Sequence, residues 1–82
     1  MATVRYYGQM AQTLGIKEEQ LEGKTVSQVL NQFKKIHGTD LYKEAKRCHI
    51  LVDHSNAGTE KGFRTPVKPD GLVEIVPVCG GG

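Results

Sequence analysis

The end of the chain holds the residues whose types and spacing best suit chemistry. An apolar, strand-like run leads directly into Val78-Cys79-Gly80-Gly81-Gly82. Glycine adds no side-chain packing and loses the most backbone freedom on ordering, so these glycines contribute nothing to a core. A bare terminus with a free carboxylate suits a chain end that must thread into a narrow site of another protein. The alternative is a frayed tail without a role, as at many termini.

A metal site is the other chemistry to consider, at Cys48, His49 and His54. These residues lack the paired close spacing of structural zinc sites, and no fourth ligand is evident. We therefore predict no metal site, and expect His49 at a strand edge and His54 in a turn. No nucleophile–base constellation is evident either, so the sequence predicts no catalytic residues of its own.

The composition indicates one small domain. Of 82 residues, 38% are hydrophobic and 24% charged, which fits a globular protein and argues against disorder. No apolar stretch approaches the length that spans a bilayer, and residues 1–3 run into a strand pattern without signal-peptide architecture. We expect a cytoplasmic protein that has no membrane partner.

The charge gives little reason to expect a nucleic-acid partner, since the formal net charge is only +2. Basic residues do gather in the middle of the chain, at Lys34, Lys35, Lys43, Lys46 and Arg47. They fall on or beside predicted helices, where a solvated polar face explains them, and no aromatic residues interleave with them.

The clearest predicted element is a helix over residues 26–37. Thr25 suits the N-cap, and Gln28 completes a capping-box pattern. An apolar stripe at helical spacing marks the face that packs on the core. Its members are Val26, Val29, Leu30, Phe33 and Ile36.

The remaining pattern predicts strands around this helix. Before the main helix we expect a strand over 3–7, a helical turn over 10–14 and a weak strand over 16–21, with the side chains of Glu18 and Glu19 solvated. After it we expect a short helix over 41–47, a buried strand over 49–53, a turn-rich loop over 54–58, a short strand over 63–65 and a last strand over 72–78. Pro77 should stop ladder pairing. This order predicts an α+β roll, with the first and last strands as parallel neighbours in mid-sheet and the helix as their crossover.

This arrangement and ending resemble the β-grasp (ubiquitin-like) sulfur-carrier family, most closely the small subunit of molybdopterin synthase. The resemblance is carried by Val4-Arg5-Tyr6-Tyr7-Gly8, Leu14-Gly15, Gly23-Lys24-Thr25-Val26 with Leu30, Asp70-Gly71, and the run from Val73 through Pro77-Val78-Cys79-Gly80-Gly81. It implies a mixed sheet of four to five strands packed on one main helix. Residues 1–78 would form the β-grasp domain and residues 79–82 a flexible tail.

Two departures stand out. Aligning the ending leaves Gly82 over, so either Gly81-Gly82 is the functional pair or Gly82 is trimmed to expose Gly81. The turn after the third strand, at residues 53–56, does not follow the asparagine-glycine-like pattern common in the family.

The resemblance implies a protein co-substrate and not an enzyme. A partner adenylating enzyme would use ATP to activate the carboxylate of Gly82, or of Gly81 if Gly82 is removed. A sulfur donor, such as a cysteine desulfurase or a rhodanese-like protein, would convert the adenylate to a thiocarboxylate, and a large synthase subunit would receive the sulfur. Gly80 and Gly81 would thread into the partner, and no cofactor would be bound by this chain.

Docking should use apolar surface beside the tail, with Val76 and Val78 as the candidates. Cys79 has two interpretations: a position that simply needs a small residue, or a thiol that attacks the activated carbonyl or takes up sulfur. The acceptor also stays open. Molybdopterin (molybdenum or tungsten cofactor) synthesis leads, with thiazole/thiamine and cysteine synthesis as rivals. A ubiquitin-like modifier joined to lysine and a binding module with an idle tail are alternatives from other classes.

Overall fold

The computed structural model describes residues 1–56 and 62–78. Its elements run in the order β1 (Ala2–Tyr6), α1 (Gly8–Leu14), β2 (Glu18–Leu21), α2 (Val26–His37), α3 (Thr39–Arg47), β3 (His49–Val52), β4 (Ser55–Asn56), the 3₁₀ helix η2 (Gly62–Arg64) and β5 (Leu72–Val76). The predicted tail, residues 79–82, lies outside the described residues, so the division into a domain over 1–78 and a tail stays a prediction.

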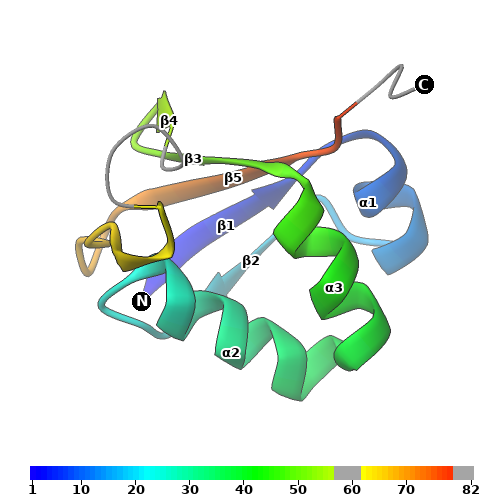
Figure 1. The fold of residues 1–82 in the computed structure, drawn as a ribbon, viewed down its shortest axis with the longest axis horizontal. Coiled ribbons are helices and arrows are strands. Elements are labelled where there is room, and N and C mark those ends of the chain that lie inside the picture. The colour runs from blue at the N-terminus through cyan, green and yellow to red at the C-terminus, as the bar shows by residue number, and fades with distance from the viewer. Residues whose placement is uncertain (57–61, 79–82) are drawn as a thin grey trace.

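One five-stranded mixed sheet organises the fold, in the order β2-β1-β5-β3-β4. β1 and β5 pair in parallel, with Thr3 opposite Leu72, while the other neighbours are antiparallel. The predicted mid-sheet pairing of the first and last strands is therefore confirmed. Figure 1 shows α2 and α3 on one face of this sheet and α1 beyond one end of it. The α+β, β-grasp fold class predicted from the sequence is confirmed.

The core lies between the sheet and α2. Alternate residues of the two central strands, Val4 and Tyr6 on β1 and Val73 and Ile75 on β5, are buried, as the period of a strand requires. The buried residues of α2 are Val26, Val29, Leu30 and Phe33.

The prediction that Ile36 belongs to the core stripe is wrong, because its side chain is 52% exposed. His37, four residues after Phe33, takes the inward position in the last turn. The ring centroids of Phe33 and His37 lie 4.7 Å apart. A histidine one residue beyond the expected position thus ends the apolar face of α2.

The start of α2 follows the predicted capping pattern with one change. Thr25 Oγ1 accepts a hydrogen bond from the Gln28 amide at 3.2 Å. The Gln28 side chain accepts a hydrogen bond at 2.8 Å from the amide of Lys24, one residue before the cap, where the standard box uses the cap residue itself. Both bonds satisfy amides that would otherwise lack partners at the helix start.

Glu19 is not solvated, contrary to the prediction. Its carboxylate accepts a hydrogen bond from the Tyr6 hydroxyl and lies 2.6 Å from Nε2 of His37. The side chains of His37 and Glu19 are only 15% and 19% exposed. Glu18, by contrast, is exposed as expected and pairs with Arg5.

Two of the later elements differ from the prediction. Residues 55–56 form β4 and not loop, because Asp53 and His54 adopt positive φ (50° and 72°) and close a two-residue hairpin turn of the kind that needs such angles. Residues 63–65 do not form a strand: η2 occupies 62–64, and the Thr65 amide bonds back to the Gly62 carbonyl at 3.1 Å. The remainder of the predicted loop, 57–58, lies outside the described residues.

Candidate functional site: the end of the last strand

The candidate site is the place where β5 ends and the chain continues toward the glycines. β5 is held on both sides, by β1 and by β3, and its ladder stops at Val76. Pro77 follows, and its ring has no N–H to extend the ladder. Figure 1 shows this end of β5 beside the start of α1, at the opposite end of the sheet from the N-terminus.

Gly8 turns the chain between β1 and α1. Its φ is +57°, a conformation that favours glycine, and a β-carbon there would make only an ordinary contact, at 3.7 Å, with Pro77 Cγ. The amide of the preceding residue, Tyr7, donates to the Ile75 carbonyl at 3.2 Å. The β1–α1 turn thus supports the last residues of β5 before the tail.

The two predicted docking residues, Val76 and Val78, lie at this end, and their role in docking stays a prediction. Val78 is 53% exposed, whereas Val76 is partly covered. Tyr7 was not predicted as a docking residue, and its side chain is 38% exposed. Tyr6 pairs with Ile75 across the two parallel strands, so Tyr7 and Val76 are the next positions along them. The predicted reacting and threading glycines, Gly80, Gly81 and Gly82, lie outside the described residues, as does Cys79.

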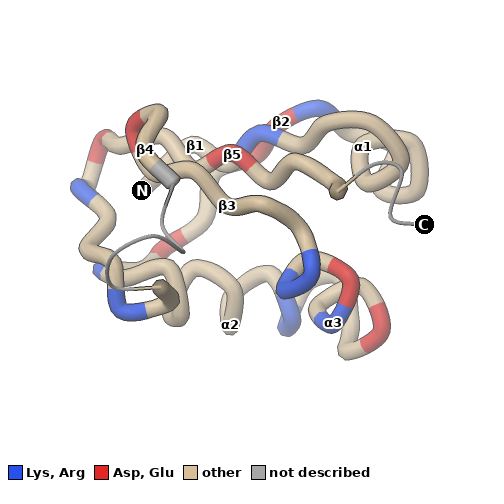
Figure 2. Tube along the Cα trace, turned by 45° about the horizontal axis from the view of Figure 1, so that its top comes forward, with Lys and Arg blue, Asp and Glu red and all other residues tan. Residues whose placement is uncertain are grey.

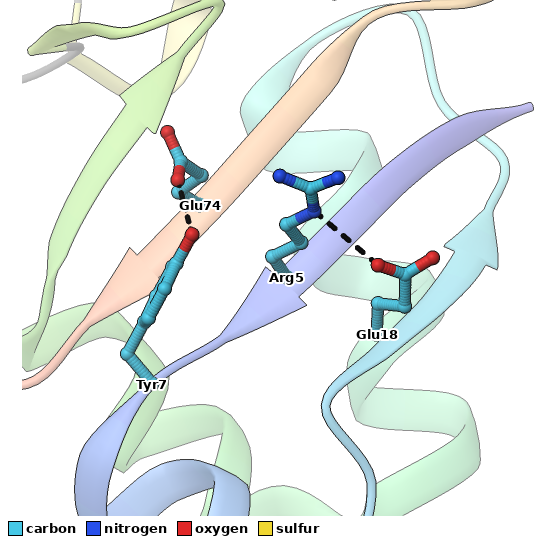
Figure 3. Close-up of polar contacts among 4 residues, drawn as sticks. All are labelled: Arg5, Tyr7, Glu18 and Glu74. Carbon is cyan, nitrogen blue, oxygen red and sulfur yellow. Dashed lines mark hydrogen bonds and ion pairs between the residues drawn. The ribbon is translucent and has the colours of Figure 1, made fainter.

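The outer face of the sheet carries a polar network beside this apolar surface (Figure 3). The Tyr7 hydroxyl donates to Glu74, and His54 Nδ1 lies 3.1 Å from the same carboxylate. Arg5 Nε donates to Glu18 at 3.3 Å. The Glu74 side chain is only 12% exposed although no helix of the described residues covers this face. The neighbouring side chains, and not a second layer, shield it.

Electrostatics follow from these contacts. The hydrogen bond to Glu74 raises the pKa of Tyr7, because loss of the phenol proton would leave two anions in contact. The hydrogen bond to Glu18 likewise raises the pKa of Arg5. Strand periodicity placed Arg5 and Tyr7 on one face, but only the strand order reveals that Glu74 and Glu18 flank them.

A small groove lies at the base of the tail, between α1 and α3. Its volume is about 180 Å³. It is lined by Gln9, Met10, Thr13, Leu41, Glu44, Cys48 and Pro77. No local sequence pattern indicates this groove, because its walls come from three segments that only the fold brings together.

The alternatives considered from the sequence can be placed on the structure. Within residues 1–56 and 62–78, no three His, Cys, Asp or Glu side chains cluster in a way that would hold a metal ion. The statement that no aromatic residue interleaves with the basic residues is wrong: Lys34 Nζ and Lys46 Nζ lie 5.2 and 4.6 Å from the Tyr42 ring centroid. Figure 2 shows acidic segments among the basic ones along α3, so the charges there are of mixed sign.

None of the helices in the described ranges is both long and apolar enough to cross a membrane.

The fold is shared with several solved structures. A chain of the BexX/CysO complex from Amycolatopsis orientalis matches with a TM-score of 0.84 and 19% identity over 100% of both chains. Small archaeal modifier protein 1 from Methanosarcina acetivorans matches with a TM-score of 0.85 and 20% identity, over 99% of this chain and 95% of that one. A Pyrococcus furiosus chain, provisionally described as molybdopterin converting factor subunit 1, matches with a TM-score of 0.71 and 22% identity, over 93% and 94%.

At these identities the solved structures establish the fold. No curated protein matches the chain by sequence. The model of the ThiS family, in contrast, matches residues 4–82, which include the glycine ending. The chain therefore belongs to the ThiS family and has the fold of the ubiquitin-like sulfur carriers and modifiers.

Proposed function

We propose that this protein is a sulfur carrier. A partner enzyme adenylates its C-terminal glycine, Gly82 or, if Gly82 is removed, Gly81, and the adenylate becomes a thiocarboxylate. The thiocarboxylate then donates its sulfur, and molybdopterin synthesis is the acceptor pathway that we propose. The observation that carries the proposal is the match of the ThiS family model through to the glycine ending.

The geometry before the tail supports this role. β5 is fixed by ladders on both sides, Pro77 ends them, and Val78 is 53% exposed. A carrier needs a firm body from which a slender end projects, because the partner must bind the body while the end reaches a buried site. Glycine at Gly80 and Gly81 keeps the backbone narrow there.

The chemistry requires activation because a carboxylate is a poor electrophile. The glycine carboxylate attacks the α-phosphate of ATP and displaces pyrophosphate, which gives an acyl-adenylate. A donor persulfide, RSS⁻, attacks the acyl carbon and AMP leaves, so a C–S bond replaces the C–O bond to AMP and an acyl disulfide forms. A thiol then attacks the donor sulfur of that acyl disulfide, which releases the thiocarboxylate and leaves the donor as a disulfide. The residues that catalyse these steps would belong to the adenylating enzyme and the sulfur donor, and the role of this chain is to present the carbon.

We prefer molybdopterin synthesis as the acceptor pathway because of the ending Pro77-Val78-Cys79-Gly80-Gly81. This ending resembles that of the small subunit of molybdopterin synthase. The fold likeness to a protein provisionally described as molybdopterin converting factor subunit 1 is consistent with it. The likeness to a chain of a BexX/CysO complex and to an archaeal modifier keeps other acceptors in the test.

The first experiment is intact-mass measurement of the untagged protein after incubation with an adenylating enzyme from the same source, ATP and a sulfur donor. The expected result is replacement of one oxygen by sulfur, mapped to the last glycine by fragmentation. The same spectrum shows whether that glycine is Gly81 or Gly82. A terminus that remains an ordinary carboxylate and forms no AMP adduct overturns the proposal.

The acceptor is tested next. The thiocarboxylate form is mixed with a large molybdopterin synthase subunit and the sulfur-free pterin precursor, and dithiolene product is measured. Sulfur transfer there supports the molybdopterin assignment. Transfer only to a thiazole or cysteine precursor reassigns the pathway, and denaturant-resistant conjugates to lysine in cell extract favour a modifier.

A further inference from the structure

The positive charge of the chain is concentrated in the last turn of α2 and in α3. The stretch 34–47 holds five of the eleven Lys and Arg residues and two of the nine Asp and Glu residues. Its formal charge is therefore +3, whereas the rest of the chain together carries −1. Figure 2 shows basic parts of both helices on the same side of the sheet. The basic residues are Lys34, Lys35, Lys43, Lys46 and Arg47.

Tyr42 gathers two of these cations. The Nζ atoms of Lys34 and Lys46 lie 5.2 and 4.6 Å from the centroid of its ring. Lys34 comes from α2 and Lys46 from α3, so cation–π attraction draws charges from two helices to one place. Lys43 lies one turn before Lys46 and extends the same side of α3. Lys34, Tyr42, Lys43 and Lys46 make up the α2–α3 basic surface.

The charge of this surface is not neutralised within residues 1–56 and 62–78. No carboxylate of those ranges lies within 4.0 Å of the ammonium group of Lys34, Lys43 or Lys46. An ion pair on α3 joins Glu44 to Arg47 instead, at 3.7 Å. Like charges that the fold holds near one another repel, and an anionic partner relieves that repulsion. The α2–α3 basic surface therefore suits an acidic ligand.

An acidic protein fits this surface better than a nucleic acid does. A single strand needs an open aromatic face on which its bases can stack, but the Tyr42 ring already holds two ammonium groups. Asp40 and Glu44 also lie on α3, and they would repel a continuous line of phosphates. A partner protein can place carboxylates opposite the lysines and other groups opposite these two acids.

The α2–α3 basic surface begins beside the end of the last strand. α3 ends at Arg47, and His49, two residues later, is opposite Val76 of β5. Residues of α3 also line the same groove as Pro77. A partner that binds at the end of β5 therefore lies next to α3.

We propose that the α2–α3 basic surface is a second docking site, which binds an acidic face of the adenylating enzyme. The identity of this partner rests on the proposed function, whereas the preference for an acidic protein rests on the charges alone. A charged contact beside β5 would steer the encounter and raise the effective concentration of the chain end at the enzyme's active site.

The first test uses the full chain and a defined acidic probe. Isotope-labelled protein is titrated with a deca-glutamate peptide at low ionic strength, and the backbone amide shifts are followed by NMR. The largest shifts should fall in residues 34–47 and should be lost at about 0.5 M salt, because exposed charges are then screened.

Two double variants with the same change in net charge separate this surface from a general charge effect. Lys34→Gln/Lys46→Gln should raise the Kd for the peptide about fivefold, because two exposed charge contacts are lost. Lys24→Gln/Lys68→Gln is the control, since both lysines are exposed and lie outside α2 and α3. The control should change the Kd by less than about twofold.

Three results of this titration would overturn the proposal. Equal losses in the two double variants, or equally large shifts around Lys24 and Lys68, would show that the peptide follows net charge alone. Tighter binding of an oligothymidylate of the same length at residues 34–47 would favour a nucleic-acid partner instead.

The second test concerns the partner. In ATP–pyrophosphate exchange with the adenylating enzyme from the same source, Lys34→Gln/Lys46→Gln should raise KM about fivefold at low ionic strength and leave kcat unchanged. A KM equal to that of the control variant would overturn the choice of the adenylating enzyme. If the unmodified protein supports no exchange, the proposed function fails, while the peptide titration still decides whether the surface binds acidic ligands.

Discussion

The carboxylate of Glu19 lies 2.6 Å from the imidazole Nε2 of His37 and so joins the second strand to the last turn of the main helix. The same carboxylate accepts a hydrogen bond from the hydroxyl of Tyr6 on the first strand. One half-buried acid thus connects three elements at the edge of the core.

Glu19→Ala should lower the free energy of unfolding by about 1–3 kcal/mol, because the substitution leaves the Tyr6 hydroxyl and the His37 ring without their acceptor. Glu18→Ala is the matched control, since Glu18 is its exposed neighbour and should cost no more than about 0.5 kcal/mol. Urea unfolding at neutral pH measures both. Equal losses would show that Glu19 contributes nothing beyond a surface charge.

The raised pKa of the Tyr6 phenol predicts that the protein loses stability at alkaline pH. Burial, followed by the hydrogen bond to Glu19, raises the pKa of its phenol in the folded protein. A raised folded-state pKa gives stability that is complete below the unfolded value, about pH 10, and is lost as the pH rises above it. Above pH 10 the free energy of unfolding should fall by up to about 1.4 kcal/mol per pH unit on account of this group.

Tyr6→Phe should remove the part of the fall in the free energy of unfolding above pH 10 that is due to Tyr6. The same substitution should lower the stability at neutral pH. The chain has three tyrosines, so phenolate absorbance offers a second measurement in which one tyrosine should ionise only as the protein unfolds. An unchanged slope in Tyr6→Phe would contradict the assignment to Tyr6.

The two sides of α2 should respond very differently to truncation. Phe33 is fully buried, so Phe33→Ala should destabilise the protein by about 3–5 kcal/mol through lost burial and the cavity left behind. Ile36 is 52% exposed, and Ile36→Ala should cost less than about 1 kcal/mol. The denaturation midpoints of the two variants test this difference. Similar midpoints would indicate that Ile36 is part of the buried face of α2.

Among the glycines in the described part of the chain, Gly23 is the one whose replacement should be most damaging. A β-carbon there would lie 2.6 Å from the Val29 backbone nitrogen, and its φ is +152°. Overpacking and backbone strain each cost about 1–3 kcal/mol, so Gly23→Ala should lose several kcal/mol. A β-carbon at Gly15 would have no atom within 4 Å, so Gly15→Ala should be destabilised only by the positive φ at that position. Thermal melts of both variants test this order.

Val78 should matter for the partner and not for the fold. Val78→Asp places a charge on the exposed apolar surface beside the tail, and we expect KM for the adenylating enzyme to rise about tenfold, the equivalent of about 1.4 kcal/mol. Phe63→Asp is the control, since Phe63 is 42% exposed and belongs to η2, which Figure 1 shows at the other end of the sheet from the end of β5. ATP–pyrophosphate exchange measures both, and similar KM values for the two variants would exclude Val78 as a contact.

The sequence predicts the elements that its periodicity and caps define. Thr25 and the apolar stripe locate α2, and the alternation of Val73 and Ile75 orients β5 correctly. The failures occur where tertiary contacts override local pattern. Glu19 looks like any surface acid until His37 and Tyr6 are brought beside it, and residues 63–65 have strand-like composition but close a turn on Gly62.

For the candidate site, the sequence supplies the end of β5 and the family resemblance. It does not supply the contacts of Tyr7 with Glu74, because these residues are 67 positions apart and meet only through the parallel pairing of their strands. The groove that contains Cys48 is hidden for the same reason: no local pattern relates α1, α3 and Pro77.

The central place of β5 has a mechanical consequence. Because β1 and β3 hold it on both sides, a pull on the chain end acts along the strand and loads both ladders in shear, with many hydrogen bonds strained together. At an edge strand the same pull could open the bonds one after another, like a zipper. A partner that draws the tail into a narrow channel would therefore be pulling on a strand that is anchored on both sides.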